Sequence, residues 1–312
     1  MSYLLRRVHL VEISKGRIYC SCIAQLCDFR ISVTLVSMIY VLLGVLGLAL
    51  GSFVNALVWR VRMQDKGGLK KKKPSKDLSI LRGRSMCVHC KHSLRWIDLI
   101  PVISWASLKG RCRYCKKTIS WQYPVVECVL AILAVGSYLF WPYELSSWAS
   151  WVVLITWVIS LVPMLALVIY DIKWMEMPTR IIYSLNGTAV VFIGLMAYDL
   201  KSWDIVISSI AGSTLLGGLF WMIYQISGGR WIGGADVRYG FTMGALLGWQ
   251  GAVLGLALAS YLGTALIIVL IAIGKYHKKM RIPFGPFLIS ATYIAALFGQ
   301  QVINWYKSLA GL

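Results

Sequence analysis

Acidic residues are scarce in this chain: Asp and Glu account for only 12 of its 312 residues, against 32 Lys and Arg. Charged residues of both signs reach only 14%, whereas 58% of the residues are hydrophobic and the mean hydropathy is +0.70. This shortage of charge argues against a soluble globular domain. It indicates a polytopic helical membrane protein.

Two sequence features of other protein classes are also absent. No apolar stretch of adequate length precedes the first expected span, and no small-residue cleavage site stands out, so we do not expect residues 1–37 to be a secretory signal peptide. Residues 1–37 instead form an N-terminal extension of uncertain status, and Met38 opens a compact alternative start. The chain also has no Gly-rich Rossmann loop, so composition alone assigns no nucleotide site.

Long apolar runs predict an all-α polytopic fold with about eight transmembrane helices. The first helix is expected over 38–59, which overlaps an apolar run at 34–58, and a polar insert follows over 60–121. A seven-helix membrane domain then extends over 122–312, and its sixth span is short and Gly-rich. The eight runs are 34–58, 122–141, 149–170, 179–198, 205–225, 237–250, 251–274 and 284–305.

Positive charge follows the expected topology. Of the 32 Lys and Arg, 17 lie between Arg60 and Lys117, and most others fall in alternate later loops. By the positive-inside rule these loops are cytoplasmic, which places a multi-pass protein in the cell membrane with the 60–121 insert inside. The charge thus needs no nucleic-acid partner. The Lys run at 70–73 is interpreted as a solvated linker that can also contact anionic lipid headgroups.

Four cysteines in the insert have the spacing of a metal site. Cys87 and Cys90 form one Cys-x-x-Cys pair, and Cys112 and Cys115 form a second pair after 21 intervening residues. Four thiolates suit tetrahedral Zn²⁺, and with no open position such a site is structural. The alternatives are two disulfides, which a cytoplasmic location disfavours, or four free thiols.

Two aspartates lie at the edges of apolar segments. Asp171 precedes a short turn to Pro178, and Asp236 follows Gly233 and Gly234 in a loop that can bend closely. Two facing carboxylates hold one proton between them, so one can activate water while the other polarises a peptide carbonyl. Such a dyad hydrolyses peptides without a metal; the alternative is that each Asp marks a membrane boundary.

Five motifs in order give the chain a family resemblance. They are Gly51-Ser-Phe-Val-Asn55 with Arg60, the cysteine segment continuing to Ile119–Glu127, Asp171 with Pro178, Gly233-Gly-Ala-Asp236-Val-Arg, and Ile282-Pro-Phe-Gly-Pro286. With these motifs the chain resembles the type IV prepilin peptidases, also called prepilin leader peptidase/N-methyltransferases. One departure is Ala235, which stands where the GxGD pattern of the family has its second Gly and predicts a stiffer loop.

The resemblance implies that Asp171 and Asp236 are catalytic and cut leaders from prepilins or pseudopilins at the bacterial inner membrane, in pilus assembly or type II secretion. It also implies N-methylation of the new terminus with S-adenosylmethionine, to which Glu127 is a candidate contributor. The alternative for Glu127 is a buried polar residue paired with a base.

Two other functions stay open at this point. One is a peptidase without methyl transfer, in which the zinc site serves stability alone. The other is a non-catalytic scaffold or a transporter, although transport sites usually lie nearer the bilayer midplane. The sequence fixes neither the particular substrates nor the oligomeric state.

Overall fold

The computed structural model describes residues 18–67, 79, 83, 85–277 and 280–311, with backbone alone for 18–36. In this part of the chain the elements are α-helices and one 3-10 helix, with two isolated β-bridges in the cysteine insert. The expected all-α fold is therefore confirmed.

Helix α1 (Ile18–Gly67) is longer than the first predicted span. Its candidate membrane span is Ser37–Asp65, which includes the predicted 38–59. The chain divides into two compact units, 1–42 and 43–312, and α1 begins in the first and ends in the second. The Lys run at 70–73 lies outside the described residues.

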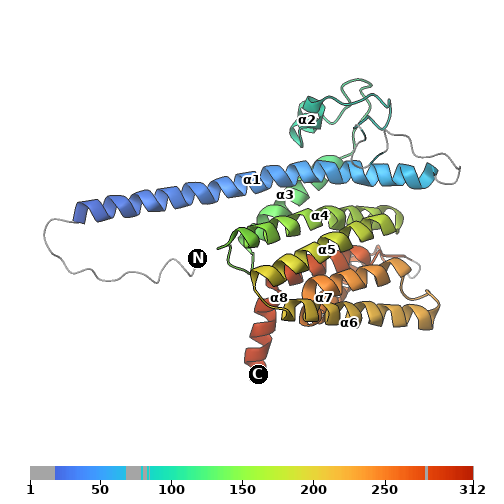
Figure 1. Ribbon diagram of the computed structural model, residues 1–312. Coiled ribbons are helices and arrows are strands. Elements are labelled where there is room, and N and C mark those ends of the chain that lie inside the picture. The colour runs from blue at the N-terminus through green and yellow to red at the C-terminus, as the bar shows by residue number, and fades with distance from the viewer. Residues whose placement is uncertain (1–17, 68–78, 80–82, 84, 278–279, 312) are drawn as a thin grey trace. The chain divides into compact units, whose positions relative to one another are not determined.

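Six further helices are long and apolar enough to cross a membrane, which makes seven with α1 among the described residues. They succeed one another with short connections, and α4, α5 and α6 run side by side in Figure 1. Their bounds are α3 Gln122–Leu139, α4 Trp148–Trp174, α5 Thr179–Asp199, α6 Asp204–Ser227, α7 Gly234–Ala272 and α8 Gly285–Ala310.

Helix α7 consists of two helices that meet at Gly248, whose φ of 67° and ψ of 177° are not helical. A Cβ on Gly255 would lie 2.4 Å from Cε of Met243. In a straight helix these residues are about 18 Å apart along the axis, so the chain reverses direction between them. The expected sixth and seventh spans, 237–250 and 251–274, are these two segments, and the first is the short one.

Small residues let α6 and the first half of α7 approach each other closely. A Cβ on Gly244 would lie 2.1 Å from the carbonyl oxygen of Gly212, and one on Gly217 would meet the ring of Phe241. Because lipid is as apolar as the side chains, such backbone contact replaces the hydrophobic effect as the cause of association. At the reversal, Ser208 Oγ of α6 accepts the N–H of Trp249 at 3.3 Å.

Between α1 and α3, the described part of the insert carries the short helices η2 (Trp96–Leu99) and α2 (Ile103–Ser107). Asn55 joins α1 to the start of α3, where the insert ends. Its Nδ2 donates to the carbonyl of Tyr123, and its Oδ1 accepts from Nε2 of Gln122. The first two family motifs therefore meet in space.

Candidate active site and metal centre

The helix order brings both aspartates to one end of the bundle, which we call the aspartate end. Helix α4 finishes there at Trp174, and the antiparallel pair α5 and α6 returns the chain to the same end. Helix α7 then begins at Gly234, two residues before Asp236.

Asp171 lies in the last turn of α4 and is 6% exposed. Its Oδ2 accepts the backbone N–H of Gly285, the first residue of α8, at 3.0 Å. The N–H groups of a helix start lack partners within their own helix and carry partial positive charge, so they favour a carboxylate. The Pro-Phe-Gly-Pro turn thus places the start of α8 against Asp171.

Asp236 occupies the third position of α7 and is half-buried. Its Oδ2 accepts the N–H of Gly233, which precedes the helix, at 3.3 Å. Ala235 adopts helical geometry and needs no positive φ, so alanine fits where the family pattern has glycine.

The two carboxylates lie within electrostatic reach of each other. Each carboxylate also lies at the start of a helix and accepts one backbone N–H from a glycine there. Asp171 of α4 lies at the start of α8, and Asp236 lies at the start of its own helix, α7. The Asp171–Pro178, Gly233–Arg238 and Ile282–Pro286 motifs meet at this position. The arrangement can hold a carboxyl and a carboxylate on either side of a polar substrate group.

The turn that follows Asp171 is held to α1. Arg62 Nη1 lies 2.7 Å from Oε2 of Glu176, and its guanidinium lies over the Trp174 ring at 4.6 Å from the centroid. Arg180 Nη1 donates to Oε1 of Gln64 at 3.0 Å. These contacts restrain the connection between α4 and α5 and hence the end of α4 that carries Asp171.

The four insert cysteines come together as the spacing predicts. Their sulfurs all lie within 4.8 Å of one another, and Cys87 Sγ is 3.9 Å from Cys115 Sγ. Thiolates bound tetrahedrally to zinc at 2.3 Å are about 3.8 Å apart, so the donor set fits zinc. No disulfide links them.

The two cysteine pairs form the same turn twice. The N–H of Cys87 donates to the carbonyl of His92, and the N–H of Cys112 donates likewise to Lys117. Each turn closes with a β-bridge, Met86 to Ser93 and Arg111 to Thr118. The residue after each second cysteine, Lys91 or Lys116, has a positive φ. Repetition of one local structure places two thiols from each turn around a common point.

The electrostatics of the sulfurs also favour a cation. Burial raises the pKa of Cys87, but backbone N–H groups of Cys90 and His89 and neighbouring thiols outweigh it and lower that pKa to about 7. The N–H of Lys117 lowers the pKa of Cys115, yet burial and the three other thiols raise it to about 11. Four thiolates therefore need a bound metal ion to coexist.

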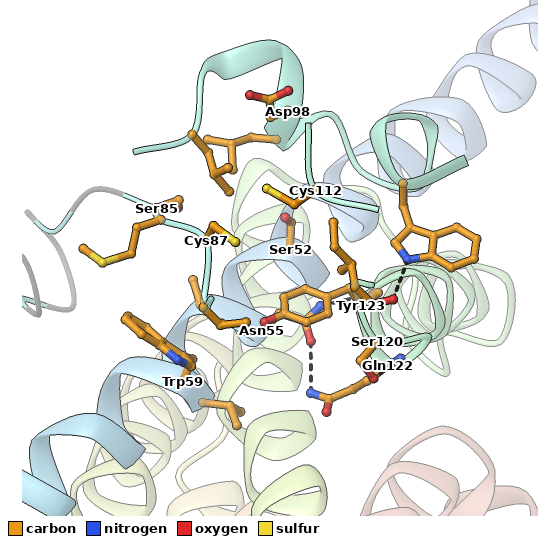
Figure 2. Close-up of a pocket in the computed structure, with 18 of the residues that line it drawn as sticks. Ser52, Asn55, Trp59, Ser85, Cys87, Asp98, Cys112, Ser120, Gln122 and Tyr123 are labelled. Atoms are coloured by element: carbon orange, nitrogen blue, oxygen red, sulfur yellow. Dashed lines mark hydrogen bonds between the residues drawn. The ribbon is translucent and has the colours of Figure 1, made fainter. Parts of the chain in front are cut away.

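A cavity of about 560 Å³ lies between α1, the cysteine insert and the start of α3 (Figure 2). Its lining combines aromatic rings with polar groups, including Trp59, Trp105, Asn55, Arg60 and Glu127. Figure 2 shows Cys87 and Cys112 on the insert side and Asn55 on the α1 side, with Gln122 hydrogen-bonded to it. The cavity is large enough for a nucleoside-sized ligand.

Glu127 is 6% exposed at the border of this cavity. Its Oε2 accepts the backbone N–H of Val102 at 2.7 Å, and Ser52 also donates to its carboxylate. Its partners are therefore neutral donors. A Cβ on Gly51 would lie 2.6 Å from Cα of Glu127, so α1 approaches α3 at this point without room for a side chain.

The structure thus separates the predicted residues into two groups. The aspartates lie at the aspartate end, whereas Glu127 and the cysteine cluster, through Cys87 and Cys112, border the cavity. The sequence did not predict that the N–H of Gly285 donates to Asp171. The one signal for it is the Gly285-Pro286 pair, because proline in the first turn marks the start of a helix, where backbone N–H groups are free to bind an acid. The cavity had no local signal, because segments far apart in the sequence line it, including the end of α4.

Comparison with known proteins follows the same division. Residues 45–141 match the bacterial peptidase A24 N-terminal domain, and residues 157–269 match the type IV leader peptidase family. No solved structure matches the chain.

Several named proteins are similar along most of their length, and each is called prepilin leader peptidase/N-methyltransferase. The Aeromonas salmonicida protein is 32% identical over 273 residues, which cover 84% of this chain and 91% of that protein. The Aeromonas hydrophila protein is 34% identical over 72% of this chain and 74% of its own, and the Pseudomonas aeruginosa protein is 28% identical over 85% and 92%.

Proposed function

The chain belongs to the type IV leader peptidase family, and we propose that Asp171 and Asp236 are its catalytic dyad, which removes the leader from prepilin-like proteins. The observation that carries this assignment is their convergence: residues 65 positions apart reach one end of the bundle within electrostatic reach. The motifs around them are the ones that resemble the family.

In this reaction the ionised carboxylate takes a proton from water, and the resulting hydroxide attacks the scissile carbonyl. The protonated carboxyl donates to the carbonyl oxygen, and the tetrahedral intermediate expels the amine as its nitrogen gains a proton. Gly285 and Gly233 fix one oxygen of each carboxylate and so leave the other oxygen for substrate or water. The proposal needs no metal for proteolysis.

The distribution of Lys and Arg supports an orientation in the inner membrane with the aspartate end on the cytoplasmic side. A substrate anchored by its apolar helix would present its leader junction at that depth. Pilus and secretion-system subunits, the prepilins and pseudopilins, have this form according to the family resemblance.

Incubation of the purified full-length protein with a prepilin, with and without S-adenosylmethionine, tests both proposed activities. Mass spectrometry should find a product shortened by the leader in both reactions, heavier by one methyl group only with the donor. An unshortened prepilin would contradict the peptidase; a shortened but never methylated product would identify a peptidase in which the zinc site serves stability alone.

For methyl transfer, we propose that the cavity beside the cysteines accommodates S-adenosylmethionine. The cavity supports this because aromatic rings suit an adenine base and Glu127 supplies negative charge near the cationic sulfonium. When bound, the donor supplies an electrophilic methyl group to an amine. The four cysteines would hold zinc, whose structural bonds keep the cavity wall in place.

Glu127→Gln tests this second site, because glutamine can still accept the Val102 N–H while it removes the charge. We expect donor affinity to fall about tenfold and leader cleavage to be retained. Donor binding is measured by titration calorimetry, with Glu144→Gln as a control for loss of one carboxylate elsewhere. Equal affinities in all three proteins would contradict the placement.

A further inference from the structure

The cysteine insert contains an apolar segment that its own fold leaves uncovered. Residues 96–108, Trp-Ile-Asp-Leu-Ile-Pro-Val-Ile-Ser-Trp-Ala-Ser-Leu, include η2 and α2 and have one charged residue, Asp98. The side chains of Trp96 and Ile103 are 76% and 66% exposed, and neither lines the cavity. An apolar stretch of this length is too short to span a bilayer but suits an interfacial segment.

The one acid of this segment is turned away from solvent. Arg113 Nε lies 2.7 Å from Oδ1 of Asp98, whose side chain is 4% exposed. The backbone N–H of Arg95 and the hydroxyl of Tyr114 donate to Oδ2. The outer surface of the segment is consequently apolar.

Basic side chains surround the segment. Arg95 immediately precedes it, Lys109 immediately follows it, and both are exposed. Residues 85–121 contain seven basic residues and one acidic residue, Asp98. The basic residues are Lys91, Arg95, Lys109, Arg111, Arg113, Lys116 and Lys117. Exposed Trp and Ile within a basic rim match an anionic lipid surface, where apolar groups enter the headgroup boundary and cations meet phosphates.

The contacts of the segment also fix its depth. The N–H of Val102 donates to Glu127, the sixth residue of α3, and Trp105 Nε1 donates to the carbonyl of Ile119 just before that helix. Because α3 is a candidate membrane span, the segment lies level with the first turns of a helix that enters the bilayer. Trp121 at the same level is 69% exposed, as in an interfacial aromatic belt.

We propose that residues 96–108 form an interfacial anchor that docks the cysteine insert on an anionic bilayer surface. The anchor is distinct from the Lys run at 70–73 and does not depend on either catalytic activity. It would hold the insert at the membrane, where the new terminus of a membrane-anchored substrate emerges.

Hydroxyl-radical footprinting of the full-length protein in lipid nanodiscs tests the anchor through oxidation of Trp96. We expect about fivefold slower oxidation with phosphatidylglycerol present than in phosphatidylcholine alone, because anionic lipid draws the segment into the boundary. Arg95→Gln combined with Lys109→Gln should abolish the difference while the Trp96 reporter stays in place. Zinc content, unchanged in that variant, verifies that the insert remains folded.

The matched control is Lys275→Gln with Arg281→Gln, which removes two exposed cations from the connection between α7 and α8. This control should keep the lipid dependence at Trp96, and Trp203, 79% exposed at the other end of the bundle, should show none. Equal oxidation of Trp96 in both lipids, or protection that requires added prepilin, would overturn the proposal.

Discussion

Gly285 shows how one backbone N–H organises the proposed dyad. Its N–H donates to Oδ2 of Asp171 at 3.0 Å, and a Cβ there would lie 2.5 Å from that oxygen and 2.0 Å from Cε of Met177. The fit of α8 against Asp171 therefore depends on the absence of a side chain.

Gly285→Ala should displace the Asp171 carboxylate. We expect leader cleavage to fall about 100-fold, because catalytic groups misplaced by about 1 Å cost that much. Gly194→Ala, on the open face of α5 with no atom within 4 Å of the added Cβ, is the control and should cleave normally. The assay is gel mobility of the processed prepilin; wild-type rates in Gly285→Ala would refute the role of this contact.

At this scale the sequence predicted residue types well and partners poorly. Asp171 and Asp236 stood out because acids are rare beside apolar runs, and the cysteines because of their spacing. Glu127 stood out as a candidate for methyl transfer, but its buried position and its hydrogen bond from the N–H of Val102 were not predicted. Partners supplied by a distant backbone leave no side-chain signature.

The proposed zinc site should make the fold of the cysteine insert depend on a bound metal ion. Cys87→Ser should reduce bound zinc from about one ion per chain to none and lower the thermal stability of the insert, because three thiolates and a hydroxyl hold zinc poorly. Leader cleavage should persist, since the aspartates lie in another part of the fold. Metal analysis and thermal unfolding measure the effect, with Cys128→Ser on α3 as control; unchanged zinc would exclude this ligand.

The close contact between α6 and α7 can be tested by the addition of a single methyl group. Gly244→Ala should destabilise the protein by about 1–3 kcal/mol, because the added Cβ meets the backbone of Gly212. Gly218→Ala on α6, where nothing lies within 4 Å, is the matched control and should be neutral or slightly stabilising. Thermal unfolding in detergent distinguishes them, and equal midpoints would contradict the close approach.

Element boundaries were predictable where apolar runs end at polar turns. The reversal at Gly248 was also visible as a boundary near 250, although its contacts with Ser208 were not. The extent of α1 was underestimated, because the helix continues into charged residues as far as Gly67 and hydropathy measures only the part suited to lipid.

Across the whole molecule, the five motifs converge on two sites that share the end of α4. Asp171 belongs to the proposed dyad, and Trp174, one turn later, lines the cavity and stacks under Arg62. Removal of a leader at the first site would leave the new amino terminus of the shortened substrate near the second. This proximity gives a physical reason for two activities in one chain.

The central claim is that Asp171 and Asp236 act together in hydrolysis, and cleavage by Asp171→Asn and Asp236→Asn tests it most directly. Each substitution keeps size and a carbonyl oxygen that can accept the glycine N–H, so the variants should insert, bind zinc and bind methyl donor normally. We predict that either change alone abolishes leader cleavage of a purified prepilin. Cleavage at the normal rate by either variant would contradict the dyad.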